Sequence, residues 1–265
     1  MNNGVRYDGV ICSYYYSLFS ITSSNFTNNN AADNGGVMLV FSGSSFGITN
    51  SAFSNNAAEQ GGVMYTSASS FDITSSNFTN NNATNNGGVM LVFSGSSFGI
   101  TNSSFGNNAA KYYGGVVYTS DSSFDVRSSN FSTNSATKCG GVMCAFSELS
   151  FDIISSVFNN SAAEYGGVIY TSESSFNITS SDFSNNSATR YGGVAYAFND
   201  SSFDITSSTF SNSGAEYGGV MYASNSSFKV TGESSIEIFA TNNEVVYISS
   251  RVHVSNKLTR TKYSY

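Results

Sequence analysis

The sequence contains no proline and no tryptophan, and only 10% of its 265 residues are charged. Typical soluble domains carry about 25% charged residues. Ser, Thr, Asn and Gly supply most of the polar share, and the aromatic residues are 22 Phe and 17 Tyr. This composition excludes a highly charged disordered tail and is unlike that of an ordinary enzyme.

Positive charge and long apolar runs are also scarce. Ten Lys and Arg face 17 Asp and Glu, so the net charge is −7. Nucleic acids and anionic membranes both require a basic surface, and we therefore expect neither as a partner. No stretch approaches the ~18–20 apolar residues of a membrane-spanning helix, so we expect no membrane insertion by this chain. No signal peptide is visible at the N-terminus, and the chain is open to interpretation as a fragment.

Cysteine and histidine are too few for the common catalytic and metal-binding motifs. Cys12, Cys139 and Cys144 are odd in number and lack a CxxC spacing, which gives no disulfide framework and no zinc site. The one histidine, His253, lies outside the regular repeats described below. A Ser-His-Asp or Cys-His catalytic group needs a histidine in a pocket, so we predict that the chain is not an enzyme.

A different catalytic chemistry remains open. Glycoside hydrolysis requires only two carboxylates about 5–9 Å apart. Asp125 and Asp152, with Arg127 nearby, are the best candidates for such a pair. The alternative to a non-enzymatic protein is therefore a carbohydrate-active enzyme of the polysaccharide lyase or hydrolase kind.

A repeat of 26 or 27 residues occupies most of the chain. The first glycine of a Gly-Gly pair recurs eight times, at positions 35, 61, 87, 114, 140, 166, 192 and 218. The spacing from the second glycine to the next phenylalanine alternates between ten and nine residues. A further phenylalanine follows that phenylalanine seven residues later. Between these landmarks, segments such as SSFDIT alternate apolar and polar residues, which predicts strands with one buried face.

One repeat has room for three short strands but cannot bury a core alone, whereas stacked repeats can. We therefore predict an all-β protein: a single right-handed parallel β-helix of about nine to ten 26-residue coils, with three short strands per coil. Residues 1–243 are assigned to the repeat domain. Residues 244–265 are assigned to a decayed last coil and a C-terminal tail.

Residues one period apart are expected to stack in columns. Gly192 and Gly193 belong to the glycine column, which we interpret as a tight corner. A phosphate-binding loop would instead occur once and open a helix. A second column is interpreted as a ladder of hydrogen-bonded amides; its members are Asn29, Asn55, Asn81, Asn108, Asn134, Asn160, Asn186 and Asn212.

The strand after each glycine pair has two faces. We expect the column that contains Met38 and Met64 to face the interior of the solenoid. The Val column, which includes Val37, and a Tyr column are expected on the opposite face. The outward tyrosines would form a strip on which a sugar or a protein could stack; they are Tyr65, Tyr118, Tyr170, Tyr196 and Tyr222.

Two charged columns occur in the later repeats. Lys138, Glu164, Arg190 and Glu216 alternate in sign, as in an exposed salt-bridge ladder. The second column carries charge of one sign, because its members are Asp121, Glu148, Glu173 and Asp200. These carboxylates either lie on solvated turns or hold calcium, and no other cofactor is expected.

The repeated GGV[MIVA] with FTNNNA or FSNNSA resembles the polymorphic outer membrane protein repeat, known from chlamydial surface proteins. Val replaces the usual Ala after the glycine pair. The FxxN spacing holds at Phe183 and Asn186, and Ser161 and Ser213 interrupt it elsewhere. The resemblance implies a right-handed β-helix displayed on a cell surface, with adhesion as its usual role and a host or neighbouring cell-surface protein or glycan as partner.

We therefore predict a non-enzymatic extracellular or cell-surface module for adhesion or structural display. The alternatives are the carbohydrate-active enzyme and a calcium-stabilised structural spacer.

Overall fold

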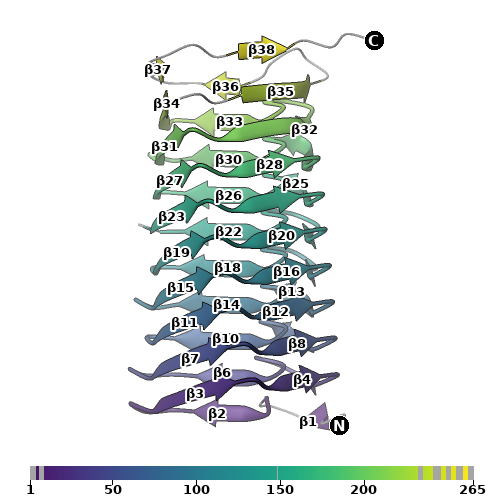
Figure 1. Cartoon of the computed structure of the whole chain (residues 1–265), viewed down its shortest axis with the longest axis vertical. Coiled ribbons are helices and arrows are strands. Elements are labelled where there is room, and N and C mark those ends of the chain that lie inside the picture. The colour runs from purple at the N-terminus through teal and green to yellow at the C-terminus, as the bar shows by residue number, and fades with distance from the viewer. Residues whose placement is uncertain are drawn as a thin grey trace.

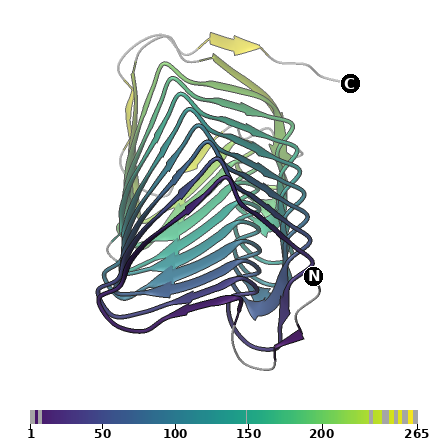
Figure 2. The ribbon, with the colours of Figure 1, turned by 60° about the horizontal axis from the view of Figure 1, so that its bottom comes forward.

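The computed structural model describes residues 4–5, 9–147, 149–231, 235–240, 246–248, 252–254 and 259–261. The regular structure in these residues consists of strands alone. The chain winds through flat coils stacked along one axis, and the stack has a roughly triangular cross-section (Figures 1 and 2). The prediction of an all-β parallel solenoid with coils about 26 residues apart is confirmed.

The first face, sheet 1, follows the glycine pairs. It contains ten parallel strands: β2 (Ile11–Ser13), β6 (Met38–Val40), β10 (Met64–Ser67), β14 (Met90–Phe93), β18 (Val117–Ser120), β22 (Met143–Phe146), β26 (Ile169–Ser172), β30 (Ala195–Phe198), β33 (Met221–Ser224) and β36 (Val246–Ile248).

The second face, sheet 2, holds the SSFDIT-like segments. Its ten strands are β3 (Leu18–Thr22), β7 (Ser45–Thr49), β11 (Ser70–Thr74), β15 (Ser97–Thr101), β19 (Ser123–Arg127), β23 (Ser150–Ile154), β27 (Ser175–Thr179), β31 (Ser202–Thr206), β34 (Ser227–Thr231) and β37 (Val252–Val254).

The third face, sheet 3, is divided in most coils into two short strands by a bend. The strands that follow sheet 2 are β4 (Asn25–Thr27), β8 (Ala52–Ser54), β12 (Asn77–Thr79), β16 (Ser104–Gly106), β20 (Asn130–Ser132), β24 (Val157–Asn159), β28 (Asp182–Ser184), β32 (Thr209–Ala215), β35 (Ser235–Ala240) and β38 (Thr259–Thr261). The strands after the bend are β1 (Gly4–Val5), β5 (Asn30–Ala31), β9 (Ala57–Gln60), β13 (Asn82–Asn86), β17 (Ala109–Ala110), β21 (Ser135–Ala136), β25 (Ala162–Tyr165) and β29 (Ser187–Tyr191).

The coil count agrees with the repeat. Two sheets contain ten strands each, and eight coils carry the glycine pair. The segment after residue 243 continues the stack, because β36 pairs with β33 and β37 pairs with β34. His253 pairs through its backbone with Lys229 in this last coil. The right hand of the coil and the boundary at residue 243 stay predictions.

The core is built from columns that run the length of the stack. Each coil contributes inward side chains from all three faces, such as Met143, Phe151 and Phe158, which are at most 1% exposed. The Met column lies inside as predicted. The prediction for the Val column is wrong: Val142 and its equivalents are also buried in the core. They occupy the corner just before the sheet 1 strand, where the backbone turns and the alternation of a strand does not apply.

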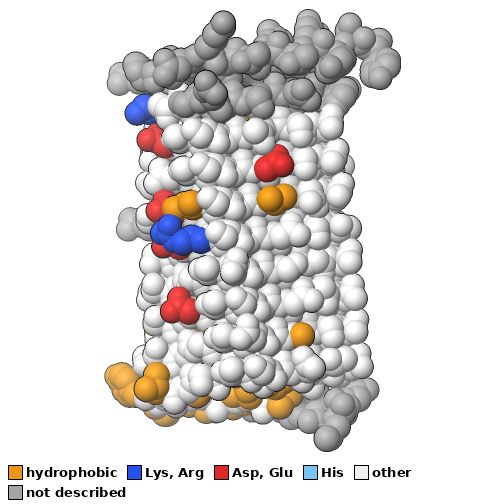
Figure 3. All heavy atoms as spheres, in the orientation of Figure 1, with side chains coloured by type: hydrophobic (Ala, Val, Ile, Leu, Met, Phe, Trp, Pro, Cys, Tyr) orange, Lys and Arg blue, Asp and Glu red, His pale blue; other side chains and the backbone are white. Residues whose placement is uncertain are grey.

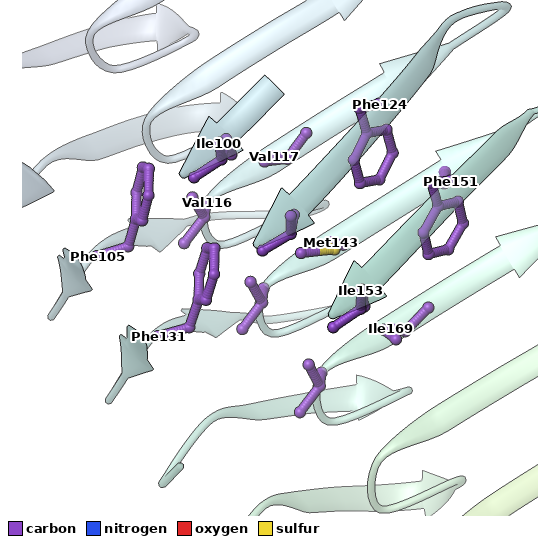
Figure 4. Packing of buried hydrophobic residues seen from close by; sticks show 14 of the residues in the cluster. Ile100, Phe105, Val116, Val117, Phe124, Phe131, Met143, Phe151, Ile153 and Ile169 are labelled. Atoms are coloured by element: carbon purple, nitrogen blue, oxygen red, sulfur yellow. The ribbon is translucent and has the colours of Figure 1, made fainter. Parts of the chain in front are cut away.

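Two phenylalanine columns form stacks inside the solenoid, one on sheet 2 and one on sheet 3 (Figure 4). Successive ring centroids lie 4.7–5.1 Å apart, with angles of only 2–11° between the ring planes. This spacing follows from the ~4.8 Å separation of paired strands, which puts identical residues directly above one another.

The glycine pair is required by the corner. Gly192 has φ +63°, and a side chain at Gly193 would collide with the carbonyl oxygen of Gly219 in the next coil. The first glycine therefore supplies a left-handed conformation and the second allows close stacking of the backbone. The corner joins strand to strand, so its geometry is that of a scaffold and not that of a phosphate loop.

The predicted amide ladder exists, but its register was wrong in three coils. The buried ladder consists of Asn29, Asn56, Asn81, Asn108, Asn134, Ser161, Asn186 and Ser213. Asn55, Asn160 and Asn212 instead occupy the preceding position, with φ of 49–54°. Coils alternate between a longer turn from sheet 1 to sheet 2, as at Gly43, and a shorter one, as at Ala68. Ladder neighbours are therefore 25 to 27 residues apart.

Within the ladder an asparagine side chain can hydrogen-bond to the coils on both sides, as Asn108 does. The backbone N–H and Nδ2 of Asn108 both donate to Oδ1 of Asn134, at 3.0 and 3.1 Å. Nδ2 of Asn108 also donates to the carbonyl oxygen of Phe78 at 2.9 Å. These bonds satisfy backbone groups that the bend removes from the sheet ladder.

Candidate functional site

The five tyrosines predicted as a binding surface lie on the outer face of sheet 1. Inward residues on the same strands, such as Ile169 beside Tyr170, are fully buried, whereas all five rings are partly exposed. Their outward orientation was predicted from the narrowness of the core. Whether they bind a partner stays a prediction.

Sequence reasoning missed four further rings on this face. Phe41, Phe93, Phe146 and Phe198 lie two residues beyond the Tyr column and are also partly exposed. The period-two alternation of a strand places positions i and i+2 on one face, and this signal was sufficient to find them. The aromatic strip is defined here as the five tyrosines and these four phenylalanines.

The rings of the aromatic strip touch from coil to coil. From Phe41 to Phe93 and from Tyr118 to Tyr222, centroids of contacting rings in successive coils are 5.1–5.9 Å apart. The ring planes meet at 51–73°. The strip therefore presents tilted rings with exposed edges and partial faces, in contrast to the parallel stacks of the core.

The aromatic strip widens near its C-terminal end. Tyr191, which precedes the glycine corner, lies 5.8 Å from Tyr196 and 4.6 Å from Tyr222 between ring centroids. The guanidinium of Arg190 lies 5.5 Å from the Tyr191 ring and donates to the Tyr165 hydroxyl at 2.9 Å. Rings and one cation thus form a continuous surface across the corner.

Burial changes the acidity of these phenols. Loss of solvent raises the pKa of Tyr65, Tyr118, Tyr170 and Tyr196 above the ordinary tyrosine value. The hydroxyls therefore remain neutral well above physiological pH. The surface offers apolar ring area and neutral hydroxyl groups.

The charged ladder beside the strip is shorter than predicted. Lys138 Nζ donates to Glu164 Oε2 at 2.8 Å, and Arg190 lies 3.9 Å from Glu164 Oε1. Within the described ranges no ion pair joins Arg190 to Glu216, which instead interacts with Tyr217. The expected alternating ladder therefore holds for three residues, Lys138, Glu164 and Arg190, and ends there.

The acidic column lies on turns between sheets 1 and 2. Asp121, Glu173 and Asp200 have φ between 49° and 59°, and Glu148 lies outside the described residues. Asp200 Oδ1 accepts a hydrogen bond from Asn225 at 3.1 Å. In the part of the chain that the structure describes, no three acidic, His or Cys side chains converge on a metal position. The calcium hypothesis therefore has no site among these residues and stays a prediction.

Asp125 and Asp152 are register neighbours on the outer face of sheet 2. They line a depression of about 170 Å³ together with Ser123 and Ser150. Each carboxylate has its own partner: Arg127 lies 3.1 Å from Asp125, and Asn177 donates to Asp152 at 2.8 Å. The Arg127 guanidinium compensates the charge of Asp125, and the Asn177 amide gives Asp152 a hydrogen-bond donor, which reduces the repulsion between carboxylates in adjacent strands.

A wider hollow of about 530 Å³ follows the bend of sheet 3 and is lined mainly by small side chains such as Ala109, Ser135 and Ala162. Lys111 and Glu164 stand at its rim. Its floor carries no aromatic ring.

The sequence matches a known family model in two consecutive coils. Residues 155–172 and 180–197 match the Chlamydia polymorphic membrane protein repeat. Two coils of the chain thus match the polymorphic membrane protein repeat. These matches and the parallel solenoid fit a repeat β-helix protein of the polymorphic membrane protein type, as the resemblance predicted, and this family indicates a surface-exposed protein. The matched stretches include Tyr170 and Tyr196 of the aromatic strip.

No curated protein and no solved structure shows a significant match to the chain. The described part of the chain contains no helix that is long and apolar enough to cross a membrane.

Proposed function

We propose that this chain is an adhesive module of a cell surface, and that the aromatic strip on sheet 1 binds a protein or glycan of a host or neighbouring cell. The observation that supports it is the chain of contacting, partly exposed rings on one outer face. The polymorphic membrane protein repeats support the surface location.

The other faces differ from the strip. Figure 3 views sheet 2 and the first strands of sheet 3, and this side is mostly uncharged and polar, with few hydrophobic side chains above the N-terminal coil. Val157 is an exposed exception on β24, at 37%. Aromatic residues are enriched where proteins bind partners, because they supply large contact area with little loss of side-chain entropy. Their concentration on sheet 1 favours this face as the binding surface.

Binding to a glycan array and to intact cells tests the proposal. The Tyr170→Ala and Tyr196→Ala variants are expected to lose most of the binding of the wild-type chain, with little change in melting temperature. Val157→Ala is the matched control, because it removes an exposed apolar side chain from another sheet. The proposal would be contradicted if the two tyrosine variants bound as strongly as the Val157→Ala control.

Two further outcomes separate the alternatives. Turnover of a polysaccharide that is abolished by Asp152→Asn would establish the enzyme instead. Absence of binding together with a large calcium-induced rise in melting temperature would establish the calcium-stabilised spacer.

A further inference from the structure

Cys139 and Cys144 flank the corner Gly140-Gly141 and occupy two positions that hold aromatic rings in the neighbouring coils. The preceding coil has Tyr113 and Tyr118 there, and the following coils have Tyr165 with Tyr170 and Tyr191 with Tyr196. Both aromatic positions are thus replaced by cysteine in the same coil.

In two other coils the rings at the equivalent positions contact each other across the corner. The ring centroids of Tyr113 and Tyr118 lie 6.2 Å apart, and those of Tyr191 and Tyr196 lie 5.8 Å apart. The corner is tight, because a Cβ at Gly140 would lie 3.0 Å from the backbone nitrogen of Cys144. The chain therefore folds back between the two cysteines.

The two thiols share a neighbour. Tyr170 pairs in register with Cys144 on the adjacent strand, and its hydroxyl hydrogen-bonds with the Cys139 thiol. The Cys139 thiol therefore reaches across the corner to the outer face of sheet 1, beside the strand next to the one that carries Cys144. Both cysteines are buried, at 6% and 0% exposure.

We propose that Cys139 and Cys144 form a disulfide across this glycine corner when the chain folds in an oxidising compartment. Disulfides persist in surface and secreted proteins, which agrees with the polymorphic membrane protein repeats. The cross-link does not depend on adhesion by the aromatic strip. It would fix one corner at the middle of the stack.

The oxidant is a small-molecule disulfide of the glutathione type. The thiolate of one cysteine attacks it and forms a mixed disulfide, releasing one small thiol. The second cysteine then attacks the protein sulfur and releases the second small thiol. The two cysteine protons end on the two released thiols, so the protein loses two electrons and two protons and the small disulfide gains them.

The environment of the two thiols determines at which stage of folding the disulfide forms. Burial raises the pKa of Cys139 to about 12 and that of Cys144 well above its ordinary value. Thiolate is therefore scarce in the folded chain at neutral pH, and exchange proceeds before the coils close. Once formed, the bond is shielded from reductants by the same burial.

Cys12 provides an internal control. It is exposed on β2, five strands from Cys144 in sheet 1, which is about 24 Å at the ~4.8 Å strand spacing. Its distance excludes it from a disulfide with either cysteine of the same molecule.

The test is alkylation of the full chain, refolded with reduced and oxidised glutathione, then denatured without reductant and mapped by mass spectrometry. Trypsin places both cysteines in one peptide, because no Lys or Arg lies between Lys138 and Arg190. We expect this peptide unalkylated and two hydrogens lighter than the dithiol, with Cys12 alkylated. Alkylation of all three cysteines would overturn the proposal, and so would a bridge between molecules.

Variants sharpen the result. Cys139→Ser and Cys144→Ser are each expected to show two alkylated cysteines, Cys12 and the unpaired partner, whereas Cys12→Ser is expected to show no alkylated cysteine. The melting temperature of the wild-type chain refolded in reductant from the unfolded, fully reduced state should lie a few degrees below that of the oxidised chain, and that of the double Cys139→Ser, Cys144→Ser variant should be the same in both conditions. An equal fall in the double variant would contradict a stabilising disulfide.

Discussion

The molecule contains two kinds of aromatic column, one inside and one outside. Beyond the first coil the inner phenylalanines are buried, and they are nearly parallel at 4.7–5.1 Å, whereas the rings of the aromatic strip are partly exposed, tilted by 51–73° and 5.1–5.9 Å apart. The inner positions hold Phe in nearly every coil. The outer positions vary among Tyr, Leu, Cys, Phe and Ser.

The difference shows which positions determine the fold. An inner ring must fill a space defined by identical rings above and below, so its size and orientation are fixed. An outer ring has solvent on one side and tolerates a change of residue. The outer face can therefore vary in sequence while the interior maintains the solenoid.

The largest expected effect comes from truncating an inner ring, and truncation of an outer ring provides the comparison. Phe131→Ala should lower the free energy of unfolding by about 3–5 kcal/mol, because it leaves a cavity between two packed rings. Phe146→Ala on the aromatic strip should lower it by about 1 kcal/mol, since it loses only ring contacts at the surface. Urea denaturation measures both. Equal losses would contradict the division into inner and outer columns.

The next largest effect concerns the buried amide ladder, and it tests how much of the free energy of unfolding this ladder contributes compared with the buried rings. Asn108→Ala removes the acceptor of the Asn81 backbone N–H and leaves the Phe78 carbonyl without its donor. We expect a loss of about 2 kcal/mol in the free energy of unfolding, the usual range for buried groups left unpaired. Asn108→Ser should lose less, because serine fills this column at positions 161 and 213. A larger loss in the serine variant would contradict the ladder.

A third prediction concerns an imperfection of the interior. The hydroxyl oxygens of Thr66, Thr119 and Thr171 are buried on sheet 1 without a hydrogen-bond partner. Valine has nearly the same shape and occupies the same column at Val40 and Val92. Thr119→Val should therefore raise the free energy of unfolding by about 1 kcal/mol. A thermal shift assay checks the sign, and destabilisation would show that the hydroxyl has a partner.

The smallest effect is expected from the charges beside the aromatic strip. The hydrogen bond from Lys138 lowers the pKa of Glu164 in the folded chain, so the pair contributes stability above the unfolded-state pKa near 4.5. This contribution is lost as pH falls through the lowered pKa. The Glu164→Gln variant should be slightly less stable than wild type at pH 7 and equal to it near pH 2. A difference that grows on acidification would contradict this assignment.

The stacking of the chain followed directly from the sequence, because a column such as Phe105, Phe131 and Phe158 is defined by its period alone. The amide ladder failed at Asn55, Asn160 and Asn212 because alternating corner lengths shift the register by one residue, and adjacent asparagines conceal that shift. The Val column was misplaced because a corner does not alternate like a strand. These errors all concern corners. At a corner, the spacing of residues in the sequence does not show whether a side chain points into the core or towards solvent.

Parts of the candidate site could not be predicted from the sequence for the same reason. The contact between Tyr191 and Tyr222 joins residues of different columns, and no single period relates them. Cys139 and Cys144 become a pair only when the glycine corner is known to fold back. The Phe residues of the aromatic strip, in contrast, were within reach of the sequence.

The alternation of corner lengths has a consequence for how such a chain can change. Ten residues separate the sheet 2 phenylalanine from the ladder residue in coil after coil, as from Phe98 to Asn108 and from Phe151 to Ser161. Length differences are taken up before and after this invariant segment, at the turn between sheets 1 and 2 and at the approach to the glycine pair. Those two edges are natural attachment points for inserted loops or foreign epitopes, which could project from the prism without altering the buried phenylalanine and amide columns.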